Sequence, residues 1–262
     1  MKSLYIFLLA AVALLTGCDS VASDDRLIEV PAATVQRNVL IEDFTGQRCI
    51  FCPAATEAIT QLQARYGDDK LIAVAIHAGP LSFKTMSGFT GLRTDVGDTY
   101  YKHWAVPNVP KAIINRRGGV FSKDAWAGRV YDEFARTTTV DIDLKCQYDA
   151  DKRRVEIETD LKTLSEDVQG RLQLWLVEDG VVAPQLFPGD ELDKEYTHNH
   201  VLRAAINGDW GTELTLTTKN VQKEKTTYTL PDGIVPGKAW VVAFFYNDSG
   251  VLQAVRQRVS LL

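Results

Sequence analysis

Two cysteines two residues apart, Cys49 and Cys52, lie between an apolar run and a segment with helical periodicity. The run Val39–Phe44 is typical of a buried strand, and the apolar residues of the following segment recur at helical spacing from Ala55 to Tyr66. A cysteine at a strand-to-helix junction lies where the helix amides and the helix dipole favour a negative charge. Because this placement lowers the pKa of a thiol, the pattern predicts a reactive dithiol or disulfide centre.

The N-terminus has the pattern of an export signal. Lys2 precedes a short apolar run that ends in Leu15-Thr16-Gly17-Cys18. This ending resembles the bacterial lipoprotein signal, which implies a signal peptide over residues 1–17 and a lipid on Cys18 as the membrane anchor. The apolar run is too short for a comfortable membrane span. The other interpretation is an ordinary signal peptide with an incidental cysteine.

The segment 18–35 contains Ser, Asp and Ala with little pattern, which predicts a flexible tether. The chain carries 29 basic and 34 acidic side chains, a net charge of −5, so we expect no nucleic-acid partner. Export implies an oxidising compartment, in which Cys49 and Cys52 can form a disulfide at rest. Cys146 lies on the apolar side of an alternating segment and is interpreted as a buried core residue.

The two halves of the chain have different patterns. Residues 36–137 alternate apolar runs with helical segments, which predicts an α/β domain containing a βαβ unit. The expected strands are 39–44, 71–76 and 112–115, and the expected helices are 53–66 and 123–136. Residues 138–262 show about seven short runs of period two, which predicts an all-β antiparallel sandwich of immunoglobulin-like type. We therefore place a domain boundary near residue 137.

Residues 36–137 resemble the thioredoxin superfamily. Asp43 stands six residues before Cys49, where thioredoxins have a buried aspartate, and Val109-Pro110 precedes a strand as the thioredoxin cis-proline does. The resemblance implies that Cys49 attacks a partner disulfide, that Cys52 resolves it, and that Asp43 accepts the proton of Cys52. Pro110 would keep a backbone edge free for the substrate.

The residues around the two cysteines depart from the thioredoxin pattern. Arg48 replaces the usual tryptophan, and Ile50-Phe51 replaces the usual Gly-Pro. We interpret Phe51 and Val109 as contacts for a protein substrate. Because the residues between the cysteines set the redox potential, the sequence leaves the direction of exchange open.

The whole chain resembles a family of outer-membrane lipoproteins of about 28 kDa from Bacteroidetes, on the stretches Glu42–Pro53 and His198–Arg203. The resemblance implies a lipid anchor, a thioredoxin-like domain and a C-terminal β-sandwich, located at the outer membrane of the cell envelope. It leaves open which face of the membrane carries the protein.

These patterns predict thiol–disulfide exchange with exported proteins, without a cofactor or metal. The alternative is an interaction lipoprotein in which the cysteine pair is structural or vestigial. A zinc site is a further alternative, with Cys49 and Cys52 joined by His77 or by His198 and His200. We favour exchange over zinc because His198 and His200 belong to the other half of the chain. His77 could instead lower a thiol pKa, or be a loop histidine satisfied by the backbone.

Overall fold

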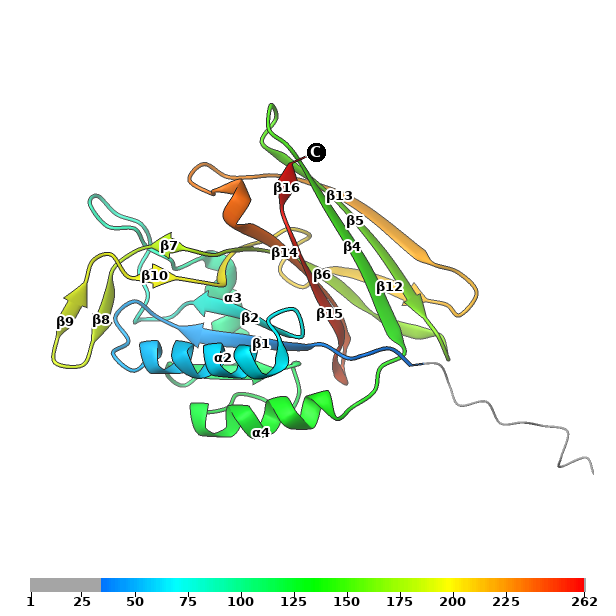
Figure 1. The fold of residues 1–262 in the computed structure, drawn as a ribbon, viewed down its shortest axis with the longest axis horizontal. Helices are drawn as coiled ribbons and strands as arrows, with labels where there is room; N and C mark the ends of the chain where they lie inside the picture. The colour runs from blue at the N-terminus through cyan, green and yellow to red at the C-terminus, as the bar shows by residue number, and fades with distance from the viewer. Residues whose placement is uncertain (1–33, 262) are drawn as a thin grey trace, which may run out of the picture. The chain divides into compact units, whose positions relative to one another are not determined.

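The computed structural model describes residues 34–261 (Figure 1). β-strands dominate, and three α-helices occur within these residues. None of the helices in this range is long and apolar enough to cross a membrane. The expected signal peptide 1–17, the lipidation site Cys18 and most of the tether lie outside the described residues.

A βαβ unit opens the fold. Strand β1 (Val39–Thr45) leads through a short loop into helix α2 (Cys52–Tyr66), and the chain returns as strand β2 (Leu71–His77). The two strands pair in parallel along their whole length. All seven residues of β1 are buried, as expected of a parallel strand covered on both faces. The predicted strand and helix positions are therefore confirmed to within one residue at most ends.

Three further elements complete this region. Strand β3 (Lys111–Ile114) pairs antiparallel with β1 on the side away from β2. Helix α4 (Lys123–Phe134) lies with α2 on one face of these strands, where Trp126 and Val130 enter the apolar core between them. Helix α3 (Asp95–His103) packs on the opposite face.

The remainder of the chain is built from strands with one short 3₁₀ turn. The strands are β4 (Val140–Asp149), β5 (Arg154–Thr163), β6 (Val168–Glu178), β7 (Val181–Val182), β8 (Gln185–Phe187), β9 (Glu191–Asp193), β10 (Thr197–His198), β11 (Val201–Ala205), β12 (Thr212–Leu216), β13 (Gln222–Thr229), β14 (Ala239–Asn247), β15 (Gly250–Arg258) and β16 (Ser260–Leu261). The 3₁₀ turn is Pro236–Lys238.

The main sheet contains strands from both sides of residue 137. Its order is β15-β14-β6-β11-β2-β1-β3, and β12 also pairs with β6. The junction is the parallel pair β11–β2, where the Ala75 amide donates to the His200 carbonyl at 2.7 Å. The expectation of a purely antiparallel sandwich therefore needs correction, because this sheet is mixed and β16 also pairs in parallel with β4. Alternation of apolar and polar residues indicates which face of a strand is buried, but it does not indicate which strand lies beside it or in which direction that strand runs.

The main sheet has a different core on each face. Leu172, Leu174 and Leu176 of β6 face the four-stranded sheet β13-β5-β4-β16, as the predicted alternation requires. Trp175 and Val177 of the same strand face the other way and join the core that contains α3. Cys146 lies in the sandwich core at 4 % exposure, where burial raises the pKa of its thiol to about 12.

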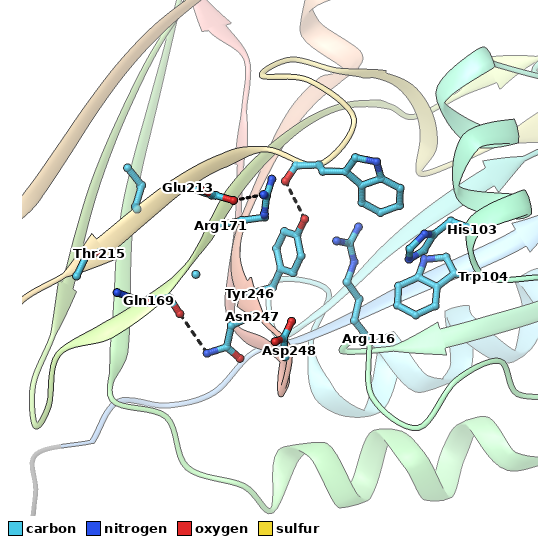
Figure 2. A pocket seen from close by; sticks show the side chains of 13 residues that line it. His103, Trp104, Arg116, Gln169, Arg171, Glu213, Thr215, Tyr246, Asn247 and Asp248 are labelled. Carbon is cyan, nitrogen blue, oxygen red and sulfur yellow. Dashed lines mark hydrogen bonds and ion pairs between the residues drawn. The ribbon is translucent and has the colours of Figure 1, made fainter.

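A buried ion pair lies on the α3 face of the main sheet. Arg116, directly after β3, donates from Nε to Glu42 Oε1 at 2.9 Å, and Glu42 is fully buried. Aromatic rings surround the guanidinium: the Phe244 centroid lies at 4.8 Å and the Tyr246 centroid, visible in Figure 2, at 4.4 Å. A buried guanidinium is costly without such a partner, so Glu42 is the residue that allows Arg116 to remain charged beneath these rings.

Candidate functional site

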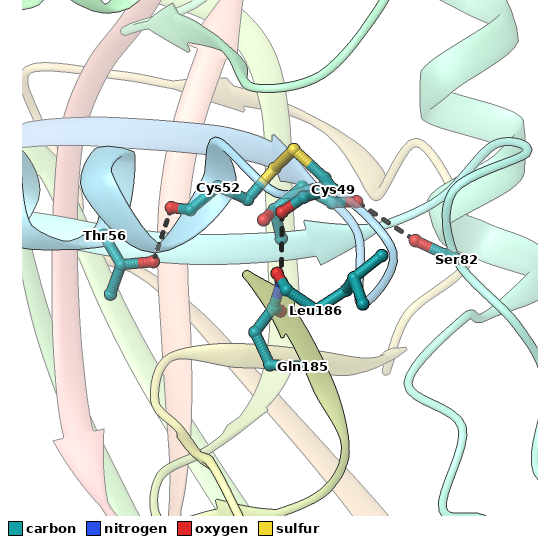
Figure 3. The surroundings of a disulfide bond; sticks show 7 residues. Cys49, Cys52, Thr56, Ser82, Gln185 and Leu186 are labelled. Atoms are coloured by element: carbon teal, nitrogen blue, oxygen red, sulfur yellow. Dashed lines mark hydrogen bonds between the residues drawn. A yellow bond between two sulfur atoms is a disulfide. The ribbon is translucent and has the colours of Figure 1, made fainter. Parts of the chain in front are cut away.

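A disulfide joins Cys49 and Cys52 at the N-terminus of α2 (Figure 3). Cys52 is the first residue of the helix, and Pro53 occupies the first turn, where no amide hydrogen bond is lost. The amide of Cys49 donates to the Gly46 carbonyl at 3.0 Å, which folds the loop back after β1. The disulfide centre expected between a strand and a helix is therefore present.

The loop before the disulfide is held against residues 81–82. A side chain at Gly46 would bring its Cβ within 2.7 Å of the Leu81 carbonyl oxygen, so only glycine fits there. The Arg48 amide donates to that same oxygen at 2.9 Å, and the Ser82 hydroxyl donates to the Thr45 carbonyl at 3.1 Å. These contacts fix the path of the chain from β1 to the disulfide.

Both cysteines are buried, with 2 % of each residue exposed. The Gln185 side chain, at the start of β8, donates to the Cys49 carbonyl at 3.0 Å (Figure 3). The Leu186 amide donates to the Gln47 carbonyl at 2.8 Å. Residues 184–186 thus pack against the cysteine loop, a contact that the sequence analysis missed. No local sequence pattern predicts this contact, because the contacting residues are about 137 positions apart in the chain.

Asp43 lies on β1 and is 2 % exposed. Burial raises the pKa of its carboxyl group to about 7, far above its ordinary value of 3.8. Within residues 34–261 its Oδ1 atom has no hydrogen-bond partner. A carboxyl group with this pKa exchanges a proton readily near neutral pH, which is the property that the thioredoxin resemblance implies for Asp43.

The Val109–Pro110 peptide bond is cis, as the resemblance implied. Pro110 directly precedes β3, whose first residue, Lys111, pairs with Phe44 of β1. Val109 is half-buried. Phe51, between the two cysteines, is 65 % exposed.

Two histidines lie beside Cys52. The rings of His77 and His198 have centroids 5.2 Å apart, and both residues line a cavity of about 20 Å³ together with Cys52 and Gln185. Burial lowers the pKa of His77 well below its ordinary value and lowers that of His198 to about 4, so both rings are neutral at pH 7. The sequence suggests His77 for this position, and it suggests His198 only in the zinc alternative, together with His200. The pairing of His77 with His198 is not predicted.

His200 is separated from this group. It adopts a positive φ of 59°, and its Nδ1 atom lies 3.1 Å from Asp179 Oδ1. Among the described residues no group of three or more His, Cys, Asp or Glu side chains is placed to hold a metal ion. Because the two cysteines are joined to each other, the arrangement gives no support to the zinc interpretation.

The fold and the disulfide define a mostly β protein with mixed sheets and a buried cysteine pair at a helix N-terminus. The family model of the outer membrane protein Omp28 matches residues 97–261. The chain therefore belongs to the Omp28 family, and its location is the outer membrane of the cell envelope.

Solved structures extend the comparison. HBP35 of Porphyromonas gingivalis is similar with a TM-score of 0.68 at 17 % identity, over 86 % of this chain and 76 % of that one, which shows a shared fold. A domain of the outer membrane lipoprotein Omp28 from Porphyromonas gingivalis matches with a TM-score of 0.36 at 23 % identity, over 47 % of this chain and 90 % of that domain. A search of curated proteins finds no match.

Proposed function

We propose that this Omp28-family protein exchanges thiols and disulfides with exported proteins through Cys49 and Cys52. The observation that carries the proposal is the disulfide at the first turn of α2, next to a strand that contains a buried carboxyl group with a pKa of about 7. The βαβ unit with β3 antiparallel to β1 supports a thioredoxin-like assignment for residues 36–137.

The reaction starts from the oxidised cysteine pair, in which Cys49 and Cys52 form a disulfide. A substrate thiolate attacks Cys49 Sγ and breaks the bond to Cys52, which leaves as a thiolate and takes a proton from Asp43. A second substrate thiolate then attacks the sulfur bonded to Cys49 and releases the Cys49 thiolate. The substrate loses two electrons and gains a disulfide, and the cysteine pair is reduced. Run in reverse, the same steps reduce a substrate disulfide.

This mechanism requires that a substrate thiolate can reach the sulfur atom of Cys49. Cys49 is 2 % exposed, so a substrate can approach only when residues 184–186 move away from the cysteine loop. The burial of both cysteines also favours a second candidate function, in which the disulfide is structural and the protein acts by binding a partner.

Reduction of insulin by the purified full-length chain, with a dithiol as electron donor, separates the two functions. We expect the wild type and a Cys146→Ser variant to be active and a Cys49→Ser variant to be inactive. Cys146 is the matched control because it is a free cysteine in the core. Equal rates for wild type and Cys49→Ser, or a disulfide potential below about −300 mV, would instead establish a structural disulfide.

We further propose that a lipid on Cys18 anchors the protein at the outer membrane. Mass spectrometry of the mature N-terminal peptide is expected to show an acylated Cys18 that follows removal of residues 1–17. A Cys18→Ser variant should leave the membrane fraction. Retention of this variant in outer membranes would exclude the lipid as the anchor.

A further inference from the structure

A second site lies on the α3 face of the main sheet. A cavity of about 1020 Å³ is lined by residues of α3, the end of β3, β6, β12 and β14, together with Trp210 (Figure 2). Ligand pockets in proteins commonly occupy about 300–1,000 Å³, so this cavity is large enough for an extended small molecule. None of its residues takes part in the disulfide chemistry proposed above.

Two hydrogen-bond donors at this cavity are buried without an acceptor among residues 34–261. One is Nη1 of Arg116, a residue that is only 8 % exposed, and the other is Nε1 of Trp104. Buried donors are nearly always paired, so two in one cavity require an explanation. Both donors belong to side chains in the wall of the cavity, so a ligand that supplies acceptor oxygen atoms pairs them once the neighbouring side chains shift to admit it.

The charges of the site indicate a neutral ligand. Arg116 is already paired with Glu42, and Arg171 is paired with Glu213. Asp248 adds a further carboxylate to the lining. An anionic ligand would find no uncompensated positive charge here, and it would lie near carboxylates. The Arg116 guanidinium already lies beside the rings, with the Tyr246 centroid at 4.4 Å and the Trp210 centroid at 5.9 Å, so its positive charge repels a ligand cation from this place.

The rings that line the cavity remain partly accessible. Trp104, Trp210 and Tyr246 are half-buried, and the His103 ring lies tilted against Trp210 at a centroid distance of 4.4 Å. Such rings provide flat apolar surfaces. The polar side chains around them, including the amides of Gln169 and Asn247, can donate and accept hydrogen bonds.

We propose that this cavity binds a neutral saccharide. A pyranose ring has an apolar face of C–H groups that packs on an aromatic ring, and its edge carries hydroxyl and ring oxygens. These oxygens are acceptors for Arg116 and Trp104, and the hydroxyl hydrogens are donors to the amide and carboxylate oxygens of the lining. A neutral saccharide thus meets the rings, the unpaired donors and the balanced charge together.

Isothermal titration calorimetry of the purified full-length chain tests the proposal. The probes are neutral oligosaccharides of glucose, mannose, galactose and N-acetylglucosamine, with an oligomer of galacturonic acid as the charged comparison. We expect at least one neutral probe to bind more tightly than the acidic one. Binding of none of the neutral probes, or of the acidic probe alone, would overturn the proposal.

Three variants locate the binding. Trp210→Ala removes a stacking surface and is expected to weaken the affinity by about tenfold or more. Trp104→Phe keeps a ring but removes the unpaired donor, with an expected loss of about fivefold. Tyr131→Ala is the matched control, because Tyr131 is an aromatic residue 61 % exposed on α4. Equal affinity for Trp210→Ala, Trp104→Phe and wild type, with near-ultraviolet spectra confirming folded protein, would place the sugar elsewhere and overturn the assignment.

Discussion

The disulfide region and the aromatic cavity treat buried ionisable groups in opposite ways. In the disulfide region, Asp43, His77 and His198 form no ion pair with another of residues 34–261, and burial shifts the pKa of each toward its neutral form. At the cavity, burial alone would lower the pKa of Arg116, but Glu42 raises it above its ordinary value. A buried group therefore stays charged only where the fold supplies a partner.

The comparison also separates a closed site from an open one. The disulfide adjoins a cavity of about 20 Å³, whereas the aromatic site encloses about 1020 Å³. Chemistry at sulfur benefits from exclusion of water, while capture of an extended ligand requires an open entrance. The two regions lie on one sheet but have no lining residue in common. A substitution in one region can therefore be controlled by measuring the other.

The largest expected effect on stability comes from removing Arg116, the charged partner of Glu42 that distinguishes the cavity from the disulfide region. Arg116→Met leaves Glu42, which is 0 % exposed, as an unpaired buried carboxylate. We expect the free energy of unfolding to fall by about 3–5 kcal/mol in urea titrations at pH 7. The double variant Glu42→Gln with Arg116→Met should recover much of this loss. A cost below about 1 kcal/mol for the single variant would show that the pair does not hold the fold.

Asp43→Asn should change the pH dependence of stability. The folded pKa of about 7 lies above the ordinary 3.8, so the native state binds more protons between these values. The stability contributed by this protonation is complete below about pH 4 and is lost as the pH rises through 7, by up to about 4 kcal/mol. Urea unfolding from pH 4 to pH 8 should show this decline in wild type relative to Asp43→Asn.

The histidines do not obscure this measurement. Burial depresses the pKa of His198 from 6.5 to about 4, so its contribution is present above 6.5 and is lost as the pH falls through 4. This trend is opposite to that of Asp43. Since both histidines titrate in wild type and in Asp43→Asn, their effect cancels in the difference. A difference that does not change with pH would mean that Asp43 ionises normally.

Loosening the cover of the disulfide should affect access more than global stability. Gln185→Ala removes the hydrogen bond to the Cys49 carbonyl, worth about 1–1.5 kcal/mol, so opening of this segment should become about tenfold more frequent. We expect reduction by a phosphine to accelerate by that factor. Gln173→Ala is a comparison variant, because Gln173 is a buried glutamine on β6 away from the cysteines. Unchanged kinetics in Gln185→Ala would show that this segment does not limit access.

Phe51→Ala is expected to have the smallest effect on the fold. The side chain is largely exposed, so the free energy of unfolding should change by no more than about 0.5 kcal/mol. In the insulin assay we expect a higher KM with little change in kcat, since an apolar contact to the substrate is lost. A wild-type KM would mean that Phe51 does not contact the protein substrate.

Much of the first region could be predicted from short stretches of sequence. The runs that became β1 and β2, and the helical spacing that became α2, report burial of neighbouring residues along one element. The cysteine pair, Asp43 and Pro110 followed from their spacing within these stretches and from the thioredoxin resemblance. The expected boundary near residue 137 falls between α4 and β4, although the main sheet continues across it.

The pairing of the strands after residue 137 was harder to predict, because apolar and polar residues alternate along a strand in the same way whichever strand lies beside it. It indicated that one face of β6 is buried, but not that its other face packs Trp175 against α3. It also did not show that β11 joins β2 in parallel, which carries His198 toward His77.

The βαβ unit, the cysteine pair at its strand-to-helix junction and the alternating strands that follow can all be predicted from the order of the amino acids. These features depend on contacts between residues that are close along the chain. Two arrangements become visible only in the folded chain: residues 184–186 cover the cysteine loop, and Arg116, Trp104 and Trp210 meet at one cavity. The reason is physical: such contacts join segments far apart in sequence, and their energy arises from packing and charge pairing that no local periodicity encodes.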